Sequence, residues 1–227
     1  MKYAVITALT MALGVSTAQA VVYTDTIDAG GGDMDITQVE VTHDVANINF
    51  VLTLDGTTIG LDSSKHFGIA FDTVAGGDTA ANAWDYQPYM SAGMDYFSAA
   101  WSDGANYLEM NTYSEALGGW PEWDNGGNDT WAAWTEPAIA GNTISFSVPR
   151  ATLGVTGATD SFDFDVYTFW AGGTWTADGL GATVGGSGSY DSTVEGVNTY
   201  VIPEPATFML LLISGSGLMV FRRYHKS

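Results

Sequence analysis

Cysteine is absent from this chain of 227 residues. Disulfide bonds, thiolate nucleophiles, cysteine-ligated zinc and iron–sulfur clusters are therefore excluded. Clear amphipathic helix patterns are also missing between residues 21 and 202, where glycine is abundant. A domain built from this stretch must hold together without covalent crosslinks, and its secondary structure is expected to be mostly β.

Positive charge is scarce, with 6 Lys and Arg against 26 Asp and Glu. Residues 21–202 contain 25 of the acidic residues and only Lys65 and Arg150, so their net charge is 2 − 25 = −23. Such a surface repels nucleic acid, and we expect no nucleic-acid partner. It also repels itself unless salt screens it or cations bind, which favours ionic surroundings or Ca²⁺; solubility alone is the alternative.

Catalytic motifs are lacking as well. There is no Gly-x-Ser-x-Gly elbow, no His-Glu-x-x-His zinc motif and no Gly-rich phosphate loop before a helix. His43 and His66 stand alone in or beside expected strands, where a structural role is the usual one. The many carboxylates offer glycosidase-like pairs without singling one out. We therefore expect no enzyme, with a secreted glycoside hydrolase as an alternative.

Short runs of alternating polar and apolar residues indicate strands, separated by turns rich in Gly, Asp and Asn. These patterns predict an antiparallel β-sandwich over residues 21–175. Trp101 and Trp170 lie inside expected strands and are predicted to be core residues. Residues 176–200, rich in Gly, Ser and Thr, are predicted to form a final loop and stalk. The expected strands cover residues 36–43, 48–54, 67–71, 95–101, 107–113, 143–148 and 162–170.

The C-terminal tail, residues 201–227, has three parts: a Pro-Glu-Pro element, an uncharged apolar run over 206–221, and a basic end over 222–226. The run would form a helix about 24 Å long, slightly short of a ~30 Å hydrocarbon core, and basic side chains beyond it can reach outward. This pattern predicts a single transmembrane helix. The alternative, a buried C-terminal helix, would show polar residues on one face.

This tail closely resembles the PEP-CTERM sorting signal of bacterial surface proteins. The sorting motif would be Pro203, Glu204 and Pro205, and the basic stop Arg222 and Arg223. The resemblance implies that an exosortase-type membrane protease handles the chain, and that the protein accompanies exopolysaccharide or biofilm functions. The chain would be the substrate of that protease.

The N-terminus predicts a cleavable signal peptide over residues 1–20. Lys2 provides a positive start, residues 4–15 are apolar, and Ala18-Gln19-Ala20 is a small-x-small cleavage site. The Sec export machinery would then be a partner. Positive charge beyond residue 221 favours a cytoplasmic C-terminus, which leaves residues 21–202 outside.

Two short segments of the body resemble DOMON-like sandwiches, which are related to family 9 carbohydrate-binding modules. They are residues 71–73 (Phe-Asp-Thr), followed by a Gly/Asp loop, and residues 93–96 (Gly-Met-Asp-Tyr). The resemblance implies sugar binding, sometimes with Ca²⁺, and in some members haem. Haem needs well-placed axial ligands, and with two histidines in the body we do not expect it.

Two loops are candidates for a Ca²⁺ site. Asp72, Asp78 and Asp85 lie in one Gly-rich connection and could supply hard oxygen ligands. Residues 124–129 (Asp-Asn-Gly-Gly-Asn-Asp) form the second candidate, and neither fits the EF-hand spacing. The alternative is that these loops are plain turns, because Asp, Asn and Gly accept unusual backbone angles.

A second candidate site is aromatic. Trp120 and Trp123 flank Pro and Glu122 in an expected loop that continues into Asp124. Indole faces pack against the C–H faces of sugar rings, and carboxylates accept hydroxyl hydrogens. These four residues are the predicted sugar-binding set. The alternative is that the tryptophans cap the sandwich core.

Taken together, the sequence predicts an exported protein anchored in the inner membrane and then sorted to the cell surface or the exopolysaccharide matrix. Its sandwich would bind polysaccharide without catalysis. A structural matrix or surface-layer component with no soluble ligand is the main alternative.

Overall fold

A computed structural model of the chain describes the residues that carry the fold: 20–27, 32–59, 65–80, 93–101, 108–120, 135–170, 176–180 and 197–202. They belong to one compact unit, Gln19–Pro203. The described residues form strands and turns without an α-helix. None of these residues belongs to a helix that is long and apolar enough to cross a membrane.

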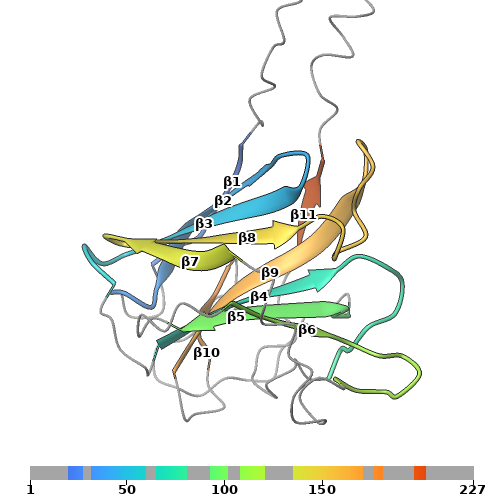
Figure 1. Cartoon of the computed structure of the whole chain (residues 1–227). Helices are drawn as coiled ribbons and strands as arrows, with labels where there is room; N and C mark the ends of the chain where they lie inside the picture. The colour runs from blue at the N-terminus through green and yellow to red at the C-terminus, as the bar shows by residue number, and fades with distance from the viewer. Residues whose placement is uncertain are drawn as a thin grey trace, which may run out of the picture. The chain divides into compact units, whose positions relative to one another are not determined.

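Five strands form the first sheet, in the order β1-β2-β3-β8-β7 (Figure 1). All neighbours in this sheet are antiparallel. β3 pairs with β8, which follows it by about ninety residues, so the centre of the sheet depends on a long-range contact. The strands are β1 (Val21–Thr24), β2 (Ile36–His43), β3 (Asn47–Leu54), β7 (Thr135–Ala140) and β8 (Thr143–Pro149).

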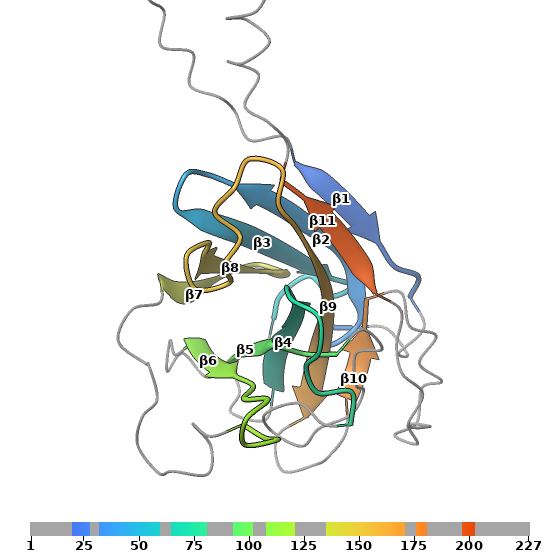
Figure 2. The same ribbon diagram turned by 90° about the vertical axis from the view of Figure 1, so that its right-hand side faces the viewer.

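Six strands form the second sheet, in the order β10-β9-β4-β5-β6, with β11 also pairing with β9. Its neighbours are antiparallel too. The long strand β9 therefore contacts β4 along one edge and both β10 and β11 along the other (Figure 2). The strands are β4 (Lys65–Asp72), β5 (Tyr96–Trp101), β6 (Leu108–Thr112), β9 (Ser161–Trp170), β10 (Thr176–Gly179) and β11 (Asn198–Val201).

The main core lies between the two sheets. Alternate residues of β3 and β8 are buried, as period-two sequences require, whereas β4 and β9 are buried on both faces along most of their length. Phe50 of β3 packs against Phe71 of β4 and Phe164 of β9, with ring centroids 5.8 and 5.4 Å apart. The predicted all-β class with two antiparallel sheets is confirmed.

A second apolar cluster covers the outer face of the six-stranded sheet. Ala70, Phe97, Tyr167 and Phe169 of the strands pack there with Trp120 of a connecting segment. None of the eight tryptophans of the chain lies in the five-stranded sheet. Trp120 is the tryptophan that the described residues place in this cluster.

Two predictions about the body were wrong. Trp170 lies in a strand as predicted, but 41% of it is exposed, because it sits at the last paired position of β9, opposite Lys65. The segment expected to begin a stalk at 176 instead supplies β10 and β11, and Tyr200 of β11 is fully buried. The sandwich thus extends to Ile202, while residues 181–196 lie outside the described part.

Residues 1–19 of the predicted signal peptide and residues 203–227 of the sorting tail lie outside the described residues. Residues 203–227 include Pro203, Glu204, Pro205, Arg222 and Arg223, so the sorting motif and the transmembrane helix stay predictions. The side chain of Trp101 is not described either, although its backbone ends β5.

Candidate functional site

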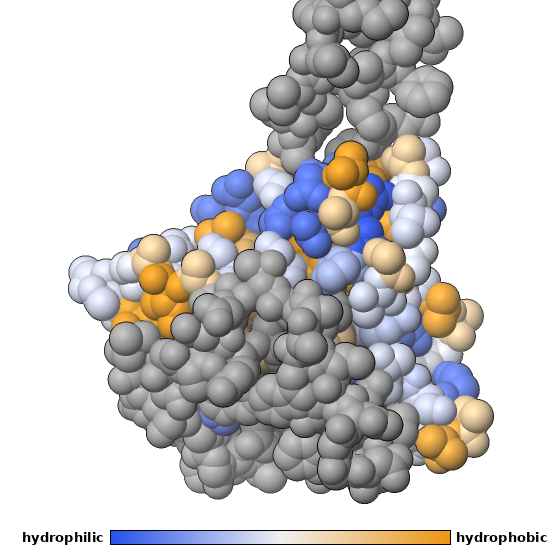
Figure 3. Space-filling view, in the orientation of Figure 1, coloured by the Kyte–Doolittle hydropathy of each residue, from blue (hydrophilic) through white to orange (hydrophobic). Residues whose placement is uncertain are grey.

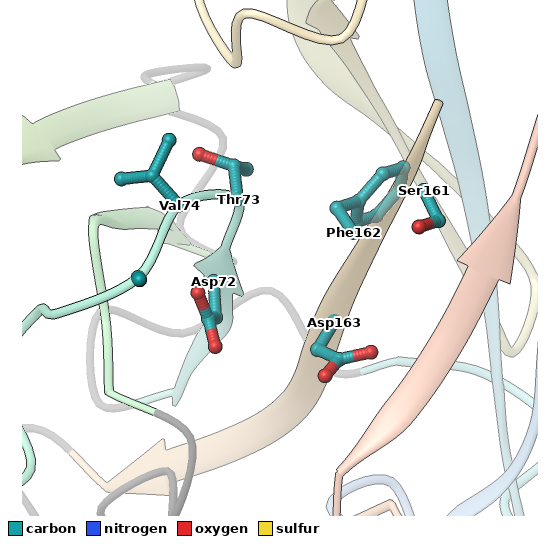
Figure 4. Close-up of a pocket in the computed structure, with 7 residues that line it drawn as sticks. Asp72, Thr73, Val74, Ser161, Phe162 and Asp163 are labelled. Carbon is teal, nitrogen blue, oxygen red and sulfur yellow. The ribbon is translucent and has the colours of Figure 1, made fainter. Parts of the chain in front are cut away.

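A hollow of about 260 Å³ opens between the end of β4 and the start of β9 (Figure 4). It adjoins β11, because Ser161 of β9 pairs with Val201. The hollow is lined by Asp72, Thr73, Val74, Ala75, Ser161, Phe162 and Asp163.

Two carboxylates face this hollow from neighbouring strands. Asp72 and Asp163 are direct partners in the antiparallel register of β4 and β9. Phe71 and Phe162, the residues beside them, point into the core, so alternation turns both aspartates to the outer face of the sheet. Directly opposite like charges destabilise a sheet.

A third carboxylate shapes the rim. Asp95 is nearly buried and accepts the backbone N–H groups of Thr73 and Val74 at 2.7 and 2.9 Å, and the hydroxyl of Thr73 at 3.3 Å. It therefore fixes the chain where β4 leaves the sheet. On the opposite side, Thr199 of β11 donates its hydroxyl to Asp163 at 2.5 Å.

The pKa of Asp72 is raised to about 6, first by burial and then by the negative charges of Asp95 and Asp163. Among the described residues, no Lys or Arg side chain compensates these charges. Lys65 pairs with Asp33, and Arg150 binds three backbone carbonyls. These two are the only basic residues between 21 and 202.

The hollow can accept hydrogen bonds from hydroxyl groups, and at pH values near 6 Asp72 can also donate one. Thr73 and Ser161 add polar groups at its lining. This set suits a hydroxyl-rich ligand better than an apolar one, because polar groups taken out of water need hydrogen-bond partners.

The predicted Ca²⁺ ligands are not gathered into a site by the described residues. Within the described part, no three His, Asp or Glu residues are placed to hold a metal ion. Asp78 uses one oxygen to accept the N–H of Ala80 at 2.8 Å and the other to accept the indole N–H of Trp120 at 3.1 Å, as a turn residue would. Asp85 lies outside the described residues, so the three-residue set stays a prediction.

The side chain of Trp120 is packed into the fold rather than exposed. Only 7% of it is exposed, and its ring meets Tyr113 edge to face at 5.4 Å. With its N–H held by Asp78, the indole offers little face to a sugar ring. Glu122, Trp123 and Asp124 lie outside the described residues, and their role in sugar binding stays a prediction.

The two histidines of the described residues, His43 and His66, are integrated into the sheets. His43 in β2 lies 2.9 Å from the hydroxyl of Tyr200, and burial and the charge of Arg150 lower its pKa. His66 in β4 is 6% exposed. Neither lines the hollow.

Sequence reasoning missed Asp163 as a site residue. The run from Phe162 to Trp170 does place Asp163 on the face opposite to Phe162. What it could not provide was the partner strand, because β4 and β9 lie about ninety residues apart in the chain.

No protein-family model matches this chain, and no curated protein matches it.

Proposed function

We propose that this chain is an exported, membrane-sorted protein of the cell surface or the exopolysaccharide matrix, and that its sandwich binds polysaccharide without catalysis. The observation that carries the proposal is the order of parts at the C-terminus: Pro203, Glu204 and Pro205, then the apolar run, then Arg222 and Arg223. An exosortase-type protease would process this tail after export through the Sec machinery.

Cell fractionation tests the sorting claim. The full-length chain should sediment with membranes or reach the cell surface, and a chain ending at Ile202 should be released in soluble form outside the membrane. A full-length chain found in the cytoplasm with both termini intact would contradict the proposal.

The ligand class is supported by the hollow at Asp72 and Asp163. Its two carboxylates, together with the hydroxyls of Thr73 and Ser161, are acceptors and donors of the kind that sugars require. The hollow is open, so a polymer can lie across it without threading an end. Neighbouring Val74 is 64% exposed and can pack against the apolar face of a sugar ring.

Affinity electrophoresis of the full-length protein in detergent, through gels that contain acidic and neutral polysaccharides, tests this claim. Asp163→Asn and Asp72→Asn should each weaken retention by at least about tenfold, because a charge-assisted hydrogen bond contributes roughly 1.5–3 kcal/mol. Glu40→Gln, on the five-stranded sheet, changes the net charge equally and should bind as the wild type does. Equal retention of all four proteins would exclude the hollow as the binding site.

The same carboxylate pair favours one rival, a glycoside hydrolase, since opposed carboxyl groups are what glycosidic cleavage uses. Turnover on a glycan panel that Asp163→Asn abolishes would replace the non-catalytic proposal.

A further inference from the structure

The first and last strands lie side by side, and both end at the same end of the sandwich. β1 begins at Val21 and β11 ends at Val201, and Figures 1 and 2 both place these two points together at the upper end. The hydroxyl of Tyr23 donates to the backbone carbonyl of Thr199 at 2.7 Å, which links the two strands.

Two further segments reach this end. Val21 pairs with Val41, so the turn over residues 44–46 that follows β2 lies close by. Val201 pairs with Ser161, which brings the connection over residues 150–160 to the same place. We call this surface the tail end: residues 21–22, 44–46, 150–160 and 201–202.

The chain is held firmly up to Ile202. This residue is 2% exposed, and its N–H donates to the carbonyl of Asp160 at 2.9 Å. Tyr200 before it is fully buried. Only residues 203–205 then separate the sandwich from the apolar run that begins at Ala206. Three residues reach about 11 Å at most, and about 9 Å in the extended form that proline favours.

Apolar side chains project from the tail end. Val45 is 96% exposed, Val201 56% and Val22 49%, and these are three of the seven large apolar residues that the described part exposes. Figure 3 shows apolar surface between hydrophilic residues at this upper end.

Two charged groups of the tail end are hydrogen-bonded to the backbone, although Asp44 itself is exposed. The carboxylate of Asp44 accepts the N–H groups of Ala46 and Asn47 at 2.7 and 2.8 Å. The Arg150 guanidinium donates to the carbonyls of Val155 and Gly157, among others, and is nearly buried. The exposed valines are the large apolar side chains that this end presents to a surface in front of it.

We propose that the tail end is a membrane-facing surface, held against the headgroups of the lipid bilayer into which residues 206–221 insert. The inference rests on the proposed membrane insertion of the tail, since the three-residue spacer then leaves the sandwich no room to stand away from the bilayer. The partner is the lipid surface, and Val22, Val45 and Val201 make the nearest contacts.

Because the chain contains no cysteine, an introduced cysteine is the one thiol that a fluorophore can label. Val45→Cys at the tail end and Leu117→Cys as a control are each labelled with a fluorophore, in full-length protein reconstituted into phosphatidylcholine vesicles that carry a headgroup nitroxide quencher. Leu117 is 70% exposed and belongs to the segment that follows β6, and β6 lies away from the upper end in both views. Quenching at position 45 should exceed that at position 117 several-fold. Equal quenching in protein that stays in the vesicles after carbonate extraction would overturn the inference.

A second variant tests the spacer. Twelve Gly and Ser residues inserted between Ile202 and Pro203 add an average reach of about 20 Å. Quenching at position 45 should then fall by at least half, and unchanged quenching would overturn the role of the short spacer. Carbonate extraction separates the two claims: protein that washes off the vesicles contradicts the proposed anchoring itself.

Discussion

Asp178 in β10 is a carboxyl group without exposed surface. One of its oxygens accepts the N–H of Ile36 at 2.5 Å. Burial raises its pKa to about 8, and the nearby charges of Asp25 and Asp35 act in the same direction. The group is therefore mostly protonated in the native state at neutral pH, whereas in the unfolded chain it would be ionised.

This difference in protonation between the native and unfolded states should make the free energy of unfolding depend on pH. Because the native state binds the extra proton, the free energy of unfolding should fall as pH rises from about 4 to 8, with this group contributing about 1.4 kcal/mol per pH unit. Asp178→Asn keeps an acceptor for Ile36 and should flatten this dependence, as urea unfolding at several pH values would show.

Asp178→Ala serves as the matched control, since it removes both the titration and the hydrogen bond. Its free energy of unfolding should also depend less on pH, and it should lie about 1–3 kcal/mol below that of Asp178→Asn at every pH. If Asp178→Asn kept the wild-type slope, the buried carboxyl would not be the group responsible.

Asp72 offers a second test at this scale. Asp163→Asn removes one of the negative charges that raise the Asp72 pKa, so the midpoint should drop from about 6 toward the usual value of 3.8 while burial still holds it above that value. Carbon-detected NMR titration of the Asp72 carboxyl measures the midpoint. Glu40→Gln is the control, and a midpoint that shifts equally in both variants would contradict a local effect.

β4 contains a glycine, Gly68, at a position where the neighbouring rings leave no room for a side chain. A Cβ at Gly68 would lie 2.6 Å from Cε2 of Phe169 and 3.0 Å from Cζ of Phe97, the rings that cover the outer face of the sheet. Gly68→Ala should therefore destabilise the protein by about 1–3 kcal/mol. Gly119→Ala, where a Cβ meets nothing within 4 Å, should change stability by less than about 0.5 kcal/mol. Thermal unfolding of both variants decides, and equal midpoints would contradict the close packing.

Arg150 joins two connections. Its guanidinium donates to the carbonyls of Val155, Asp44 and Gly157 at 2.9, 3.2 and 2.7 Å. Arg150→Lys keeps the charge but not the planar fork, so at least one buried carbonyl should lose its partner, at about 1–3 kcal/mol. Urea unfolding measures the loss, and wild-type stability in this variant would show that the fork geometry is dispensable.

The sequence predicted the strands that alternate over several residues and missed the short ones. The run at 36–43 matches β2, and the run at 162–170 matches all but the first residue of β9. The runs at 95–101 and 107–113 contain β5 and β6, which the structure pairs. β10 and β11 have four residues each, too few to show a period. They form because β9 offers them an edge, which is a property of the folded sheet.

The same limit applies to the candidate site. Asp72 could be named because it ends a recognisable strand beside a Gly-rich loop, although it was named as a metal ligand. Its opposition to Asp163 required the register of β4 and β9. Trp120 shows the converse: composition marked it as a binding residue, but its partners Asp78 and Tyr113 hold it in the fold.

For the whole molecule, the position of the last strand sets where the domain ends. A protein of residues 20–202 should fold as stably as the sandwich in the full chain, whereas residues 20–196 should be unfolded or destabilised by more than about 3 kcal/mol, because Tyr200 and its packing against Phe162 are lost. Circular dichroism and urea unfolding compare the two. A stable protein of residues 20–196 would contradict this expectation and would agree with the stalk that the composition predicted.

The late position of β11 also governs when the domain can close. A polypeptide emerges from the ribosome or a translocation channel with its first residue leading. β1 therefore emerges early, and its neighbour β11 follows only after nearly the whole chain has emerged. Until residues 198–202 appear, β9 carries an open edge and the cavity for Tyr200 is empty. Completion of the sandwich is thus timed to the arrival of the sequence just before the tail, and a premature stop there would yield an aggregation-prone chain.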